Sequence, residues 1–261
     1  MEKTKEQLLH ILSQFQLADN VVSAEPFGNG HINDTLKVTN DKGEIKYVLQ
    51  RINHLIFTNV EMLQENIHVV TTHIRKKLAE RGEEDLDRKV LTFLPTKDGK
   101  RYYFDGDSYW RVCLFIPRSK SYEEVTPELS YEAGKAFGDF QTMLSDIPEG
   151  VLGETIPNFH NMEFRLQQFH EAVAADPVGR VAEVKELIEE IEKRAEAMCI
   201  QECLYREGKL KKRTNHCDTK VNNMMFDADS DKVLCVIDLD TVMPGFVLSD
   251  IGDFIRTAAN T

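Results

Sequence analysis

The segment that decides the fold runs from Asn215 to Asp240 and reads N-H-C-D-T-K-V-N-N-M-M-F-D-A-D-S-D-K-V-L-C-V-I-D-L-D. It opens on a histidine two residues before Asp218, and Asn223 follows that aspartate by five residues. A turn rich in aspartate comes next, and then an apolar run, Val233 to Ile237, that ends at Asp238. This order predicts a loop, a hairpin and a buried strand end that bring three oxygen-bearing side chains around one point.

Phosphoryl transfer needs such a set of side chains. One aspartate accepts the proton of the acceptor hydroxyl, while an asparagine and a second aspartate hold Mg²⁺ against the phosphates. Carboxylate and amide oxygens suit Mg²⁺, which keeps several waters and takes few protein ligands. We therefore predict Asp218 as the catalytic base and Asn223 and Asp238 as Mg²⁺ ligands.

The alternative interpretation is a polar loop between two strands, closed by an Asx turn. It accounts for the acidic turn, and we assign Asp227, Asp229 and Asp231 to turn chemistry alone. It does not account for the spacing of His216, Asp218, Asn223 and Asp238, so we favour the functional interpretation.

The same residues resemble the catalytic loop of the aminoglycoside phosphotransferase and choline kinase superfamily. From Asn215 to Gly245 the chain reads almost continuously in the pattern of the N-acetylhexosamine 1-kinases, with V-I-D-L-D-T-V-M-P-G at 236–245. Cys217 replaces the usual central residue of H-G-D. The resemblance implies a protein-kinase-like bilobal α+β fold, with ATP and Mg²⁺ as cofactors. The implied reaction is phosphorylation of the anomeric hydroxyl of an N-acetylhexosamine.

The resemblance also implies roles for neighbouring residues. Lys220 either steadies the transferring phosphoryl group or is a solvated loop lysine, and Asp240 binds a second Mg²⁺ or the sugar. His216 supports the loop, and Asp250 or Asp253 accepts its backbone N–H groups. A helix cap at Ser249, with Asp250 in the first turn, is the structural alternative for that segment.

Composition limits the other functions. The chain has 261 residues, 41% of them hydrophobic and 29% charged, which suits one bilobal unit or two small domains. A formal net charge of −12 argues against nucleic acid or an anionic membrane as partner and leaves a cationic substrate open. The 5 cysteines lack metal or disulfide spacing, and the N-terminus has no signal-peptide core, so we expect a reduced cytoplasmic protein.

The N-terminal part predicts a small antiparallel sheet. A helix is expected over 4–17, and strands over 21–26, 33–39 and 45–51. Between the first two strands, a glycine turn (Gly28, Asn29, Gly30) lets the backbone approach a phosphate, although any glycine-rich hairpin would look similar.

The third strand lacks the lysine that a kinase would place there. Arg51 is the nearest cation and is either the phosphate ligand or a solvated strand-end residue, while Gln50 occupies the usual position. On the helix predicted over 61–80, Glu65 stands where a partner for the strand cation is expected, with a surface glutamate as the alternative.

Further strands are expected over 90–93, 101–104 and 109–115. The last leads out of the sheet, and by resemblance its end (Leu114, Phe115, Ile116) presents backbone groups to adenine. We therefore divide the chain into an N-lobe over 1–116 and a C-lobe over 117–261, the latter mainly helical with helices over 127–144 and 181–203.

Acceptor-binding residues are assigned by resemblance to the sugar kinases. They are His160, Asn161, Arg165, Arg256 and Asn260. A hydrogen-bonded structural histidine is the alternative for His160. The family continues past the point where this chain ends, so we expect a shortened chain that lacks the C-terminal part of the fold.

Two other functions stay open. The same chemistry would serve an aminoglycoside, choline-like or amino-acid hydroxyl, and the missing strand lysine allows a non-catalytic nucleotide-binding protein. We expect a small-molecule sugar as the partner of the protein.

Overall fold

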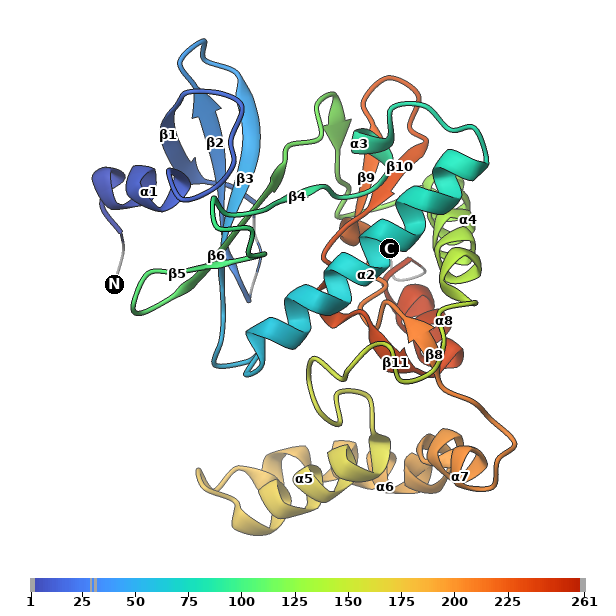
Figure 1. Ribbon diagram of the computed structural model, residues 1–261. Coiled ribbons are helices and arrows are strands. Elements are labelled where there is room, and N and C mark those ends of the chain that lie inside the picture. Colours follow the sequence, from blue (N-terminus) through green and yellow to red (C-terminus); the bar gives the residue numbers. More distant parts are fainter. Residues whose placement is uncertain (1–2, 29, 31, 259–261) are drawn as a thin grey trace.

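The computed structural model describes residues 3–28, 30 and 32–258. Asn29 and Asn260, two of the predicted site residues, lie outside the described residues. Figure 1 shows an N-terminal sheet, a larger C-terminal body and a separate arm of helices.

The N-terminal sheet is antiparallel, with strand order β1-β2-β3-β6-β4 and with β5 also paired to β6. Its strands are β1 (Val21–Pro26), β2 (Asp34–Asn40), β3 (Ile45–Ile52), β4 (Phe93–Leu94), β5 (Tyr103–Phe104) and β6 (Tyr109–Leu114). Alternate residues of a strand point to opposite faces. On β3, Tyr47 and Leu49 share a core with α1 (Lys5–Leu12), whereas Ile52 belongs to a second core on the opposite face.

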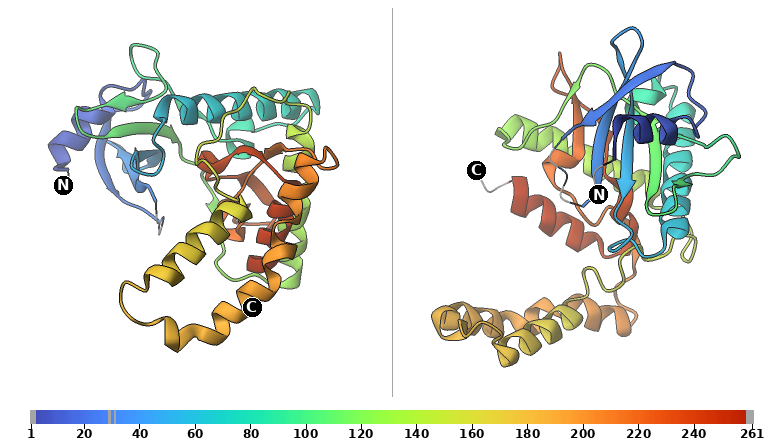
Figure 2. Two further views of the ribbon diagram at one scale, coloured as in Figure 1. Left: turned by 90° about the horizontal axis from the view of Figure 1, so that it is seen from below. Right: turned by 90° about the vertical axis from the view of Figure 1, so that its left-hand side faces the viewer.

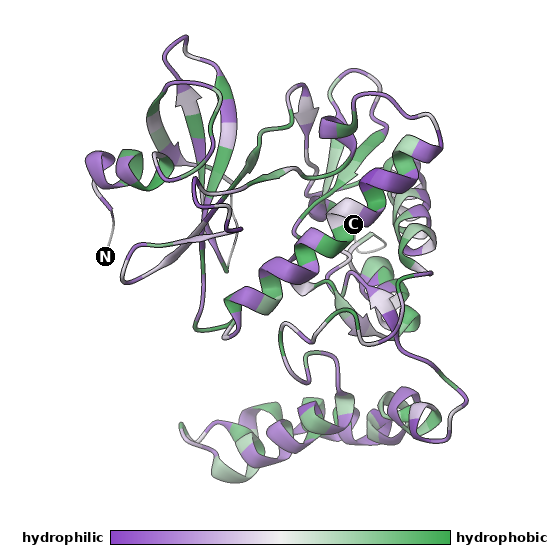
Figure 3. Cartoon of the chain, viewed as in Figure 1, coloured by the Kyte–Doolittle hydropathy of each residue, from purple (hydrophilic) through white to green (hydrophobic). Residues whose placement is uncertain are grey.

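The long helix α2 (Val60–Glu80) packs into this second core rather than into the sheet's own core. Its apolar side contacts α4 (Pro127–Leu144), and Leu239 and Val242 complete the cluster. Figure 3 shows apolar and polar residues alternating along α2, as expected for a helix with one buried side. Two cores therefore meet where the sheet approaches the C-terminal body.

The C-terminal body carries the hairpin predicted from the sequence. Strand β9 (Met224–Asp227) pairs with β10 (Val233–Val236) and with the short β7 (Ser119–Lys120), and α3 (Leu86–Lys89) lies against β10. The short 3₁₀ turns η2 (Val221–Asn223) and η3 (Leu239–Thr241) flank the hairpin. A second pair, β8 (Arg213–Asn215) with β11 (Met243–Gly245), precedes α8 (Val247–Ala258).

The remaining helices form the arm, consisting of α5 (Met162–Ala175), η1 (Val181–Val184), α6 (Lys185–Met198) and α7 (Ile200–Arg206). None of these helices contains a buried residue. In Figure 1 and in the right view of Figure 2 the arm extends away from the body.

Several predicted elements need correction. The single helix expected over 181–203 is divided into η1, α6 and α7, with a break at Cys199. The first helix ends at Leu12 rather than near 17, and Ser249 is no helix cap because α8 begins at Val247. The helix predicted over 127–144 is confirmed as α4, which Thr126 caps and in whose first turn Pro127 lies.

Among the described helices, none has both the length and the apolar character needed to cross a membrane. All 5 cysteines are free thiols.

Candidate active site

The loop after β8 is fixed by one buried carboxylate. Asp250 on α8 accepts the backbone N–H groups of His216 at 3.0 Å and Cys217 at 2.9 Å. The Thr219 hydroxyl donates to the backbone carbonyl of Asp250 at 2.6 Å. Asp253, the other candidate for this contact, pairs instead with Arg256 and lies 3.5 Å from the Thr219 hydroxyl.

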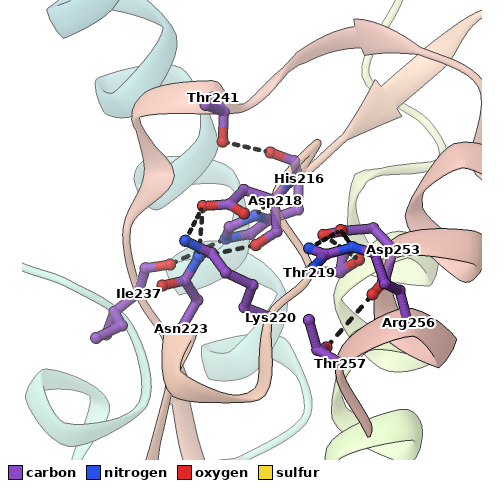
Figure 4. A network of polar contacts seen from close by, with 10 residues as sticks. All are labelled: His216, Asp218, Thr219, Lys220, Asn223, Ile237, Thr241, Asp253, Arg256 and Thr257. Atoms are coloured by element: carbon purple, nitrogen blue, oxygen red, sulfur yellow. Dashed lines mark hydrogen bonds and ion pairs between the residues drawn. The ribbon is translucent and has the colours of Figure 1, made fainter. Parts of the chain in front are cut away.

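His216 is completely buried and joins the loop to the end of β10. Its Nε2 lies 2.9 Å from the carbonyl oxygen of Ile237, and its Nδ1 accepts the backbone N–H of Asp218 at 3.3 Å. These two bonds fit a neutral imidazole with the proton on Nε2. Thr241 donates to the His216 carbonyl at 2.8 Å, so the histidine holds three segments together (Figure 4).

Cys217 occupies the left-handed backbone region, with φ of 63°. This conformation is unusual for a residue with a side chain and favours glycine. The thiol packs under Gly245, where an added Cβ would lie 3.2 Å from its sulfur. The tight turn at Cys217 points the next residue, Asp218, out of the buried network.

Asp218, Lys220 and Asn223 form a compact group (Figure 4). The Asn223 amide donates to an Asp218 carboxylate oxygen at 3.0 Å and to the Asp218 carbonyl at 2.8 Å. Lys220 Nζ lies 2.9 Å from the same carboxylate oxygen. The Asp218 side chain is 23% exposed, so a substrate can reach it.

Asp238 lies next to this group, because the backbone N–H of the preceding residue, Ile237, donates to the Asn223 carbonyl at 2.9 Å. Asp238 has φ of 58°, which turns the chain at the end of β10. The residue remains partly open to solvent. Desolvation of the carboxylate by surrounding protein atoms, together with the charges of Asp240 and Asp218, raises its pKa to about 6. A cation placed there would relieve this repulsion between carboxylates.

Asp240 does not lie with these groups as a free ligand. It is 1% exposed, and its carboxylate bonds Arg111 twice, at 2.5 and 2.8 Å. Asn33 donates to the same carboxylate at 2.5 Å. The predicted metal or sugar contact of Asp240 is therefore replaced in this structure by a buried ion pair.

The role of Arg111 as the partner of Asp240 was not identified from the sequence. It lies on β6 and also donates from Nε to Gln50 on β3 at 2.9 Å. The available signal was a charged residue inside an otherwise apolar strand, Trp110 to Leu114. Gln50, which the sequence places at the usual position of the strand lysine, thus lies beside the pair formed by Arg111 and Asp240.

The predicted partnership of Arg51 with Glu65 is wrong. On β3, Arg51 shares a face with Tyr47 and Leu49, opposite to Gln50, because side chains alternate along a strand. Arg51 pairs with Asp34, and Glu65 pairs with Arg101 at 2.7 Å.

The turn between β1 and β2 lies at the sheet end nearest the catalytic loop. Gly28 has φ of 78°, which only glycine adopts readily. Gly30 lies within the same exposed turn. Asn33 ends the turn, accepts the backbone N–H of Asn53 at 2.9 Å and bonds Asp240, so the flank of the turn before β2 is fixed.

The connector after β6 offers fewer free groups than expected. The N–H of Leu114 donates to the Thr92 carbonyl and that of Phe115 to the Lys46 carbonyl, each at 2.9 Å. Ile116 is buried, and its carbonyl accepts the Ser119 hydroxyl at 2.6 Å.

On the other side of the loop, His160 lines a small cavity of about 50 Å³ together with Cys217 and Phe246. Burial lowers the pKa of His160, against the opposing effect of Asp250 and other nearby carboxylates. Phe159 stacks on its ring at 4.6 Å.

Three other predicted acceptor ligands have structural partners. Asn161 caps α5 by accepting the Phe164 N–H at 3.1 Å. Arg165 donates to the Phe159 carbonyl at 2.9 Å, and Arg256 pairs with Asp253 at 2.6 Å.

A larger cavity of about 420 Å³ lies between α2 and the β4 segment. Ile67, Arg75, Phe93 and Arg101 are among its lining residues, and it contains none of the catalytic-loop residues. We place the candidate active site at the loop because the carboxylates and the lysine converge there.

Comparison with known proteins gives a family match and several structural matches. A protein-family model described as the phosphotransferase enzyme family matches residues 23–260. An aminoglycoside phosphotransferase from Alicyclobacillus acidocaldarius superposes with a TM-score of 0.60 at 15% identity, over 98% of this chain and 72% of that one. Spectinomycin phosphotransferase in complex with ADP and spectinomycin gives 0.59 at 10% identity, over 96% and 73%.

Ethanolamine kinase from Plasmodium vivax gives a TM-score of 0.51 at 15% identity, over 89% of this chain and 61% of that one. These structures confirm the α+β kinase-like fold, with its N-terminal antiparallel sheet and helical C-terminal region. The family match covers the glycine turn, the catalytic loop and α8 in one span. The chain belongs to the phosphotransferase enzyme family.

Proposed function

We propose that the protein transfers the γ-phosphoryl group of ATP to a hydroxyl of a small molecule, and that this hydroxyl is the anomeric one of an N-acetylhexosamine. The observation that carries the proposal is the group formed by Asp218, Lys220 and Asn223, which lies beside Asp238 and is held from behind by Asp250. Family membership supports the reaction class.

Asp218 acts as the general base. Its carboxylate is accessible, and its orientation is fixed by the Asn223 amide at 3.0 Å. It takes the proton of the acceptor hydroxyl as that oxygen attacks the γ-phosphorus. Lys220, 2.9 Å from the carboxylate, stabilises negative charge on the transferring group.

The donor set suits Mg²⁺. Asn223 and Asp238 offer one amide and one carboxylate oxygen, and the described residues contain no cluster of three His, Cys, Asp or Glu side chains that would favour another metal. Bound Mg²⁺ would neutralise charge on the phosphates during transfer. In the protein alone, crowding and neighbouring carboxylates raise the pKa of Asp238, as expected at a position that receives a cation.

The nucleotide would lie between the lobes, which we place at 1–116 and 117–261. The turn around Gly28 and Gly30 would cover the phosphates with backbone N–H groups. Adenine would meet the connector at Leu114–Ile116 through backbone groups other than the two N–H groups already bonded within the protein.

The choice of acceptor rests on the sequence of the loop. Residues 215–245 follow the pattern of the N-acetylhexosamine 1-kinases, and the cavity beside His160 opens next to the loop. The product would be the 1-phosphate of N-acetylglucosamine or N-acetylgalactosamine. The acidic chain and the fold shared with a spectinomycin phosphotransferase and an ethanolamine kinase favour an amine-bearing acceptor as the second candidate.

A panel of acceptors tests this assignment. ADP release with Mg·ATP would be measured with N-acetylglucosamine, N-acetylgalactosamine, spectinomycin, choline and ethanolamine in separate reactions. We expect release with the N-acetylhexosamines alone, and detection of the sugar 1-phosphate. Release only with an amine-bearing acceptor would replace the sugar assignment, and nucleotide binding without any release would support a non-catalytic protein.

A further inference from the structure

A buried ion pair connects the N-terminal sheet to the catalytic body. Arg111 comes from β6 and Asp240 from the segment just after Asp238, and their side chains are 3% and 2% exposed. The two guanidinium nitrogens Nη1 and Nη2 bond separate carboxylate oxygens at 2.5 and 2.8 Å. This paired geometry fixes orientation as well as distance.

Each partner is tied into its own half of the molecule. Arg111 donates from Nε to Gln50 at 2.9 Å, and Gln50 in turn donates to the Thr35 hydroxyl at 3.1 Å. These contacts connect the ion pair to three adjacent strands of the sheet, β2, β3 and β6.

The other half is equally well fixed. Leu239 and Val242, on either side of Asp240, belong to the core that includes α2 and α4. Trp110 and Val112, on either side of Arg111, belong to the core of the sheet with α1. The ion pair therefore links two segments whose neighbouring residues belong to different hydrophobic cores.

Asn33 extends the contact to the glycine turn. Its amide nitrogen lies 2.5 Å from Asp240 Oδ2, and its amide oxygen accepts the Asn53 N–H at 2.9 Å. One carboxylate thus receives bonds from the sheet and from the end of the turn, and it lies two residues from Asp238.

We propose that Arg111 and Asp240 form a positioning pair that sets the distance and angle between the glycine turn and the carboxylate of Asp238. This inference rests on the proposed nucleotide site. It assigns neither residue to metal coordination, because hydrogen bonds within the protein already use both oxygens of Asp240. The pair acts on Mg·ATP binding through the geometry of the residues around it.

A buried ion pair is a costly way to gain stability, since well-packed apolar residues of similar volume stabilise a protein at least as well. An apolar pair, however, would not fix the orientation of two cores as a forked hydrogen-bonded contact does. The expected signature is therefore a large effect on nucleotide binding that is separate from any effect on folding.

The decisive variant replaces both partners, Arg111→Met with Asp240→Leu, which avoids an unpaired buried charge. Its control is Arg81→Met with Asp139→Leu, which removes an exposed ion pair between the C-terminal cap of α2 and α4, away from the catalytic loop. Melting temperature, the Kd for Mg·ATP and the number of Mn²⁺ ions bound with nucleotide would be measured on the full chain.

We expect the double variant of Arg111 and Asp240 to melt close to the parent and to bind Mg·ATP about tenfold or more weakly, while the control binds as the parent does. The number of Mn²⁺ ions should be unchanged. Parent-like binding in the double variant, or the loss of one Mn²⁺, would overturn the proposal.

A milder variant keeps the test open if the double variant does not fold. Asn33→Ala removes the bonds to Asp240 and to the Asn53 N–H and leaves the ion pair in place. It should weaken Mg·ATP binding severalfold with only a modest fall in melting temperature, and unchanged binding would contradict the proposal. If the parent itself bound no Mg·ATP, the proposed function would fail, which is distinct from failure of the positioning pair.

Discussion

Single residues on α8 decide how the catalytic loop is held. Asp250 lies in the first turn of α8 and accepts two loop N–H groups and the Gln141 amide. Asp253 is three residues further along the helix and contacts the loop only through the Thr219 hydroxyl at 3.5 Å. Two aspartates one turn apart therefore have different roles, which their spacing alone could not distinguish.

Asp250→Ala should unfold more easily than the parent by about 2–4 kcal/mol, because buried N–H groups of His216 and Cys217 lose their acceptor. Turnover should fall as Asp218 loses its fixed position. Chemical denaturation and steady-state kinetics would measure the two effects. Asp253→Ala is the matched control and should change stability by less than about 1 kcal/mol; equal losses in both variants would contradict the assignment.

At the level of elements, the β9–β10 hairpin carries Asp238 and is closed by an Asx turn, as the sequence predicted for Asp227. The Asp227 carboxylate accepts the N–H groups of Asp229 and Ser230 at 3.1 and 2.9 Å. Its other oxygen accepts Arg88 of α3 at 2.8 Å. The sequence indicated the turn because its residues are neighbours along the chain. It did not indicate the contact with Arg88, which lies 139 residues away.

This contact predicts a dependence of stability on pH. The Arg88 guanidinium, and then the bonds from Ser230, lower the pKa of Asp227 below its ordinary value. The contact stabilises the fold fully above the unfolded pKa of about 3.9 and is lost as pH falls from there through the folded value.

Urea denaturation tests this pH dependence. It would be measured for the parent and for Asp227→Asn at several pH values from 6 down to 3, a range of roughly three units that includes that pKa. Asparagine keeps the turn bonds but not the charge. The stability difference between the two proteins should be largest at pH 6 and shrink below about pH 4. A difference that stays constant with pH would show that the charge of Asp227 does not contribute.

For the whole molecule, the local arrangement of the loop and hairpin was predictable from the sequence and long-range pairing was not. Asp218, Asn223 and Asp238 fall within one loop and hairpin, so their spacing indicated a common site. The ion pair of Arg111 with Asp240 joins residues 129 positions apart, and only the fold brings them together. The alternation of side chains along β3 could have excluded Arg51 as the phosphate ligand. Arg51 points to the same face as Leu49, and Gln50 points to the other face.

The arm was harder to predict because the apolar sides of its helices do not pack into a buried core. Residues Val181 to Cys203 suggested one helix, but the structure has three pieces with no buried residue. Helical periodicity alone does not reveal a break when no tertiary contact depends on it.

The arm should consequently be the least protected part of the described chain. Hydrogen exchange measured by mass spectrometry should show faster exchange in α5, α6 and α7 than in α2 and α4, whose apolar sides are buried. Protection of the arm equal to that of α4 would show that another surface covers it.

The account depends most on Asp218 as the base beside an intact nucleotide site. The direct test is Asp218→Asn, with turnover and Mg·ATP affinity measured on the same protein preparation. We predict a loss of turnover of at least about 100-fold with Mg·ATP affinity within about threefold of the parent, because the variant removes proton acceptance and leaves Asn223 and Asp238 in place. Turnover retained near the parental rate would contradict the assignment of Asp218.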